Sequence, residues 1–136
     1  VEHEILQKNI LVVIRFARMP PRAPASPHVR EEWLQRVQAE YTSAAMTQHL
    51  GLWLIQIGAS PDLIKSALRI VGDEMAHARL SHATYVRAGG TNAPALERER
   101  LALVRNAAQP LEADIARTGL SVFCLGETVA VPLFRR

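Results

Sequence analysis

Cysteine and long apolar runs are both scarce in this chain. Its single cysteine, Cys124, cannot form a disulfide within the chain, so no disulfide framework supports the fold, and such a low content is typical of a reducing compartment. We expect this side chain to pack as a small apolar group. No uncharged apolar run reaches the roughly 18 residues that a membrane-spanning helix needs. No signal-peptide pattern is present either, so we expect a cytoplasmic protein without a membrane partner.

Charge of one sign is not concentrated anywhere in the sequence. The net charge is only +3 over 136 residues, although the pI is about 9.6. Basic residues are scattered, and no basic stripe is interleaved with aromatic side chains, so we expect no nucleic-acid partner. Apolar residues make up 49% of the chain, which is enough for one domain with a hydrophobic core.

Prolines divide the chain into two parts. Residues 4–18 are rich in apolar side chains, with a period that is ambiguous between helix and strand. Residues 19–29 contain four prolines and are expected to form an irregular connector. The sequence therefore predicts an amino-terminal segment over residues 1–30, followed by one helical domain over residues 31–136.

Two long helices are predicted at the start of that domain. Helical periodicity covers about residues 29–57 and then residues 61–88. Gly58 ends the first helix, Ser60 and the proline after it suit the start of the second, and a pair of glycines stops the second helix. Helices joined by so short a turn must be antiparallel neighbours.

A long connection and a third helix are predicted for the rest of the chain. Residues 91–109 connect the second and third helices, with some helical character over residues 95–105. The third helix is expected from Pro110 to the end, with bends near Gly119 and Pro132. A connection of this length fits a crossover that carries the third helix across the length of a bundle. The predicted fold class is therefore all-α.

The strongest chemical signal is a Glu-x-x-His motif within residues 73–77, which read Asp-Glu-Met-Ala-His. Glu40 lies one predicted helix before the motif, and Glu127 lies one crossover after it. Glu74 and His77 are about 60° apart around a helix, so both can reach one metal ion while the glutamate bridges to a second. Carboxylate oxygen and imidazole nitrogen are donors that suit iron, manganese or zinc.

The candidate ligands lie in apolar stripes of their predicted helices. Buried carboxylates without partners cost several kcal/mol each, and a pair of divalent ions removes this cost. Asp73 lies about 40° from His77 around the helix, where a carboxylate can accept the N–H of a metal-bound imidazole on a neighbouring helix. A substrate cavity is expected beside small residues of the same faces. Its predicted lining is Ala44, Thr47, Gly51, Ser81 and Tyr85.

The region from about residue 31 to residue 136 resembles the first three helices of a ferritin-like, rubrerythrin-type di-iron carboxylate protein. The Asp-Glu-x-x-His-Ala stretch is similar to those of ferritin-like oxygenases and of rubrerythrins. The resemblance implies a cofactor of two iron ions, or of iron and manganese. It implies Glu40 as a terminal or bridging ligand, Glu74 as a bridging ligand and His77 as a terminal ligand. It also implies Glu127 as the carboxylate of the third helix.

The sequence departs from this family in one respect. The family's bundle has a fourth helix with a second Glu-x-x-His, and no further such motif occurs here, including in residues 1–30. We therefore expect a carboxy-terminal segment, or a second copy in a homo-oligomer, to supply that helix.

Three functions are consistent with these residues. The resemblance implies first an enzyme that activates dioxygen and oxidises a small organic substrate. Ferroxidase or peroxidase chemistry is the alternative, although the rubredoxin-like Cys-x-x-Cys module of rubrerythrins is absent. The third is a metal-free helical interaction domain, with Glu40 paired to Arg36 at the surface and His77 bonded to a backbone carbonyl. Ser81 occupies the position of the radical tyrosine of ribonucleotide reductase small subunits, which speaks against that branch.

Overall fold

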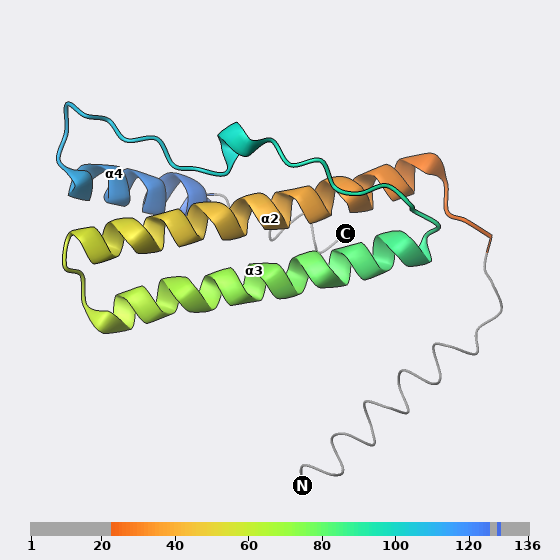
Figure 1. Cartoon of the computed structure of the whole chain (residues 1–136), viewed down its shortest axis with the longest axis horizontal. Coiled ribbons are helices and arrows are strands. Elements are labelled where there is room, and N and C mark those ends of the chain that lie inside the picture. The colour runs from red at the N-terminus through yellow and green to blue at the C-terminus, as the bar shows by residue number, and fades with distance from the viewer. Residues whose placement is uncertain (1–22, 126–127, 129–136) are drawn as a thin grey trace, which may run out of the picture.

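The computed structural model describes residues 23–125 and residue 128 (Figure 1). The described residues form three α-helices, one 3-10 turn and one π-helical stretch, and they contain no strand. The all-α prediction is therefore confirmed. The apolar segment over residues 4–18 and the bend predicted near Pro132 lie outside the described residues. None of the helices in the described ranges is long and apolar enough to cross a membrane.

Helix α2 spans Pro27–Gln56 and begins with a well-defined cap. The Ser26 hydroxyl accepts a hydrogen bond from the Val29 N–H at 3.3 Å. Pro27 fits the first helical position, because its ring fixes a helical φ and its missing N–H would have no partner there. The last proline of the predicted connector therefore starts the helix two residues earlier than the periodicity indicated.

Helix α3 spans Pro61–Arg87 and follows α2 after a tight turn. Gly58 has φ 68° in that turn, and the Ser60 hydroxyl accepts from the Leu63 N–H at 3.4 Å. At the other end, Gly89 has φ 89° and stops the helix. Both glycines adopt the left-handed conformation that other residues avoid. The predicted boundaries of the second helix are thus confirmed to within one residue.

Helices α2 and α3 pack antiparallel along their whole length (Figure 1). A Cβ placed on Gly51 would lie 3.8 Å from the Ala67 Cβ, so the two backbones approach closely at this level. Larger side chains fill the interface elsewhere and exclude water from it. The buried apolar residues are Leu34, Val37, Ala44, Leu50, Trp53, Leu54, Ala67, Ala78 and Tyr85.

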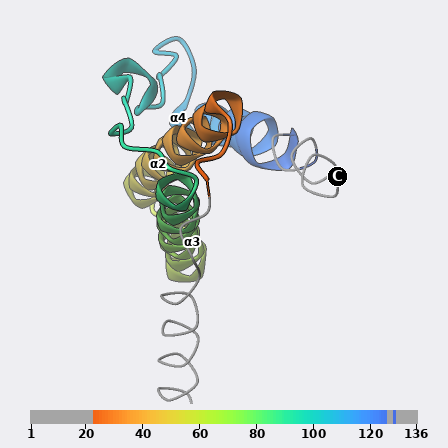
Figure 2. The ribbon, with the colours of Figure 1, turned by 90° about the vertical axis from the view of Figure 1, so that its right-hand side faces the viewer.

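The long connection returns along α2 and places helix α4, Leu111–Thr118, beside the end of α2 (Figures 1 and 2). This confirms the predicted crossover. Its predicted helical character is limited to the 3-10 turn η1, Arg98–Arg100. The α-helix changes at Gly119 into the π-helical stretch η2, Gly119–Leu125, at the position where a bend was predicted. Cys124 is exposed on η2, so the expectation that it would be packed is wrong for the described part of the chain.

Polar contacts attach the crossover to the helices. The imidazole Nδ1 of His49 accepts from the Leu103 N–H at 2.9 Å. The Tyr85 hydroxyl accepts from the Asn92 N–H, also at 2.9 Å. These bonds satisfy backbone groups that an irregular segment cannot pair with itself. They fix the connection to α2 and to the last turn of α3.

Candidate metal centre

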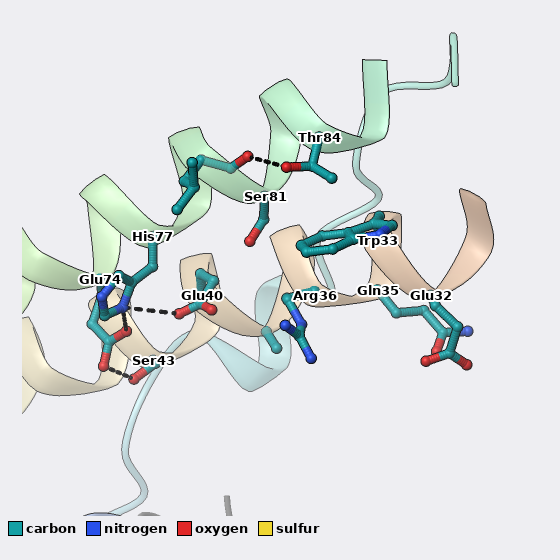
Figure 3. Close-up of a pocket in the computed structure, with 12 residues that line it drawn as sticks. Glu32, Trp33, Gln35, Arg36, Glu40, Ser43, Glu74, His77, Ser81 and Thr84 are labelled. Atoms are coloured by element: carbon teal, nitrogen blue, oxygen red, sulfur yellow. Dashed lines mark hydrogen bonds and ion pairs between the residues drawn. The ribbon is translucent and has the colours of Figure 1, made fainter. Parts of the chain in front are cut away.

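Three potential metal ligands meet midway along the α2–α3 pair. Glu40 comes from α2, and Glu74 and His77 come from α3 (Figure 3). The His77 Nδ1 lies 3.8 Å from a Glu40 carboxylate oxygen and 3.5 Å from a Glu74 carboxylate oxygen. One donor atom from each residue lies within 4.8 Å of the other two. Antiparallel packing places the middle of one helix against the middle of the other, which brings these distant residues together.

A serine on α2 holds one of the carboxylates in place. The Ser43 hydroxyl donates a hydrogen bond to Glu74 Oε1 at 2.8 Å. The other oxygen of Glu74 is the one that faces His77. Ser43 was not among the residues predicted from the sequence. Its one signal is a spacing of three residues from Glu40, which places it one turn along on the same side of α2.

The Glu40 carboxyl group has a raised pKa, about 7 against an ordinary value of 4.5. The largest cause is burial, since its side chain is only 17% exposed. A hydrogen bond with Glu74 and the charge of that carboxylate also raise the pKa, while His77 and Arg36 lower it. Two carboxylates this close cannot both ionise at low cost unless a cation lies between them.

The donor set fits a hard divalent transition-metal ion. Two carboxylates and one imidazole are the donor types that iron and manganese accept. The His77 side chain is 61% exposed, so the triad is open on that side to further ligands. The predicted fourth ligand, Glu127, lies outside the described residues. The structure thus brings together three of the four predicted ligands.

An open groove extends from the triad toward the amino-terminal part of α2. It encloses about 830 Å³ and lies between α2 and α3 (Figure 3). Both helices contribute polar and apolar side chains to its walls. Beyond the triad and Ser43, the groove is lined by Glu32, Trp33, Gln35, Arg36, Ala39, Leu80, Ser81 and Thr84.

The predicted substrate cavity matches this groove at one residue only, Ser81. Ala44, Thr47 and Gly51 are buried between the helices instead. Tyr85 is also buried, with its ring against Gly90 just after the end of α3. The prediction assumed that small side chains leave space for a ligand. The helices use the small side chains to approach each other, which removes that space.

Two other predictions concern the surroundings of the triad. Asp73 is exposed, and it makes no hydrogen bond or ion pair within the described ranges. Its predicted partner is an imidazole on a further helix, so this role stays a prediction. The metal-free alternative requires an exposed Glu40, whereas that side chain is largely buried.

Comparisons with models of protein families, with curated proteins and with solved structures found no match for this chain. A functional assignment therefore depends on the chemistry of the site.

Proposed function

We propose that this chain forms three helices of a ferritin-like four-helix bundle that binds two iron ions, or iron and manganese. Its proposed activity is the oxidation of a small organic substrate with dioxygen. The convergence of Glu40, Glu74 and His77 on adjacent antiparallel helices is the observation that supports this proposal. A glutamate on one helix facing a Glu-x-x-His on another is how di-iron bundles hold their metals.

Each residue of the site has a defined part in this proposal. Glu40 would lose its proton and serve as a carboxylate ligand, Glu74 would be the shared carboxylate, and His77 would supply a nitrogen donor. Ser43 keeps the Glu74 carboxylate in a fixed orientation, which lowers the cost of reorganisation when a cation binds. Glu127 is the proposed carboxylate of the third helix. When bound, the iron ions would supply electrons for the reduction of dioxygen.

The size and walls of the groove favour an organic substrate. Pockets for small molecules usually measure about 300–1,000 Å³, and this groove encloses about 830 Å³ beside the triad. Iron or peroxide as the sole substrate would not need such a space. We therefore propose oxidation of an organic molecule first, with ferroxidase or peroxidase chemistry as the alternative.

A further helix is needed to complete the proposed site. Leu80 lines the groove and is 68% exposed, so a helix packed over the groove would remove its side chain from water. We propose that a companion helix with a Glu-x-x-His covers the open side of the groove. It would come from a carboxy-terminal segment of the same gene product or from a second copy in a homo-oligomer.

Iron stoichiometry combined with oxygen uptake tests this function. The purified protein is loaded with Fe(II) without oxygen, desalted and analysed for iron per chain, and oxygen uptake is then measured in the presence of a reductant. We expect His77→Ala to lose most of the iron at one position and to abolish uptake, because a nitrogen donor is removed. The matched control is His82→Ala, which removes an exposed histidine of the same helix.

Full iron occupancy and unchanged oxygen uptake in His77→Ala would reject the site. Oxygen uptake that requires added free Fe(II) and stays in a fixed ratio to that iron would instead support the ferroxidase alternative.

A further inference from the structure

Ser81 is a largely buried residue whose hydroxyl faces the groove. It is only 4% exposed, and it lies four residues after His77, one turn further along α3. Figure 3 shows the hydroxyl directed between the two helices. No hydrogen bond to it is present among residues 23–125, although nearby Thr84 bonds to the Leu80 carbonyl at 3.0 Å. A ligand in the groove can therefore exchange a hydrogen bond with this hydroxyl.

The facing wall of the groove, on α2, carries the planar groups of Trp33 and Arg36. The Arg36 guanidinium lies over the Trp33 ring, 5.0 Å from its centroid. Both side chains line the groove together with the apolar Ala39 and Leu80. Planar groups stack favourably on such surfaces. Trp33, Arg36 and Glu40 are spaced by three and four residues, so they form one row along α2.

The two walls of the groove offer a ligand one polar group, the Ser81 hydroxyl, and one planar surface, formed by Trp33 and Arg36. Trp33 lies seven residues before Glu40, which corresponds to roughly 10 Å along the helix. Ser81 lies between that level and the triad, on the opposite helix. A ligand between these two walls would contact an aromatic side chain of α2 and a hydroxyl of α3.

We propose that this part of the groove binds a planar aromatic molecule with a hydroxyl or carbonyl oxygen. The ring packs against Trp33 and Arg36, and the oxygen exchanges a hydrogen bond with the Ser81 hydroxyl. This geometry presents the ring to the Glu40–Glu74–His77 triad. The identification of the ligand as a substrate rests on the proposed function, whereas its binding does not require metal.

Phenol is the probe for this subsite. Its dissociation constant for the purified full chain is measured by ligand-observed NMR, with toluene and cyclohexanol as comparison ligands. We expect phenol to bind about five- to tenfold more tightly than either, because toluene lacks the oxygen and cyclohexanol lacks the flat ring. Ser81→Ala is expected to weaken phenol binding by a similar factor and to leave toluene binding unchanged. Trp33→Leu is expected to weaken the binding of both aromatic ligands.

The matched control is Ser66→Ala on the same helix, because the Ser66 hydroxyl bonds to the Asp62 carbonyl and is exposed. Circular dichroism of each variant checks that the helices are retained. Equal phenol affinity in the wild type and in Ser81→Ala overturns the proposal, as does equal affinity for all three ligands. Phenol binding that depends on Ser81 in a protein that binds no iron would reject the di-iron function and keep this subsite.

Discussion

The protonation of Glu40 links the candidate site to the stability of the helices. In the folded chain its pKa is about 7, against an ordinary value of 4.5. The folded state therefore binds the proton more tightly than the unfolded state does. The resulting stabilisation is fully present below pH 4.5 and is lost as the pH rises through about 7. A bound divalent cation would replace the proton and restore the stability above that pH.

A first prediction follows for pH dependence. The contribution of Glu40 makes the metal-free protein less stable as the pH rises from 5 to 8, and Glu40→Gln removes this contribution because the amide does not titrate. Thermal unfolding across this range, with and without Mn(II), measures the effect. The control is Glu31→Gln, an exposed glutamate of the same helix. A Glu40→Gln profile that parallels the wild type would contradict the assignment of the pKa.

A second prediction concerns Ser43, whose hydrogen bond orients Glu74. Hydrogen bonds to charged groups contribute about 1.5–3 kcal/mol, so Ser43→Ala is expected to weaken Mn(II) binding roughly tenfold or more. Electron paramagnetic resonance of free Mn(II) measures the dissociation constant. Thr42→Ala is the control, since the Thr42 hydroxyl bonds to the backbone carbonyl of Gln38 on the same helix. Equal losses in the two variants would show that Ser43 has no specific role.

At the level of elements, α4 depends on one buried carboxylate. Asp114 is fully buried, accepts from the Asn106 N–H at 2.9 Å and pairs with Arg105 and Arg117. Both arginines are about half-exposed, so water screens part of their charge. The carboxylate connects the end of the crossover to the first turns of α4.

A third prediction tests this connection. Asp114→Asn is expected to lower the free energy of unfolding by about 1–3 kcal/mol, because a buried charge-assisted hydrogen bond is lost. Urea unfolding measures the change, and hydrogen exchange is expected to accelerate in α4 and around Asn106 more than in α2. Glu112→Gln, an exposed change in the same helix, is the control. A loss of protection spread evenly over all helices would argue against a local role.

At the level of the whole molecule, apolar side chains remain exposed on the helix pair. Both long helices carry them outside the α2–α3 interface. Those exposed on α2 and α3 are Val29, Leu52, Ile55, Leu63, Leu68, Met75, Leu80 and Val86. A further helix that packed over such side chains would remove their apolar area from water. The groove side, with Leu80, is where the proposed companion helix would pack.

A fourth prediction follows for assembly. We expect the chain to self-associate, or to bind a companion segment with a Glu-x-x-His, through the groove side. Sedimentation at micromolar concentrations is expected to give a dimer or larger particle for the wild type and a smaller one for Leu80→Gln. Leu63→Gln is a matched change on α3, outside the groove lining. A soluble monomer that binds no companion segment would contradict the proposal.

The sequence by itself determined the helices and paired the central ligands. Gly58, Ser60 with the proline after it, and Gly89 specify where α2 ends and where α3 begins and ends. These signals act within a few residues, so they can be read without the fold. The start of α2 at Pro27 was predicted two residues too late. The spacing of Glu40 and the Glu-x-x-His motif also predicted one site, because antiparallel neighbours of similar length must place their midpoints together.

Only the tertiary structure decided the details of the site. It placed Ser43 against Glu74, buried Asp114 between two arginines and located the groove beside Trp33. It also closed the space predicted around Gly51, because the two helices pack directly there. Each outcome depends on the rotation and separation of the helices, which are set by the sum of many weak contacts along their length. A local pattern of residues therefore does not predict the rotation and separation of the helices.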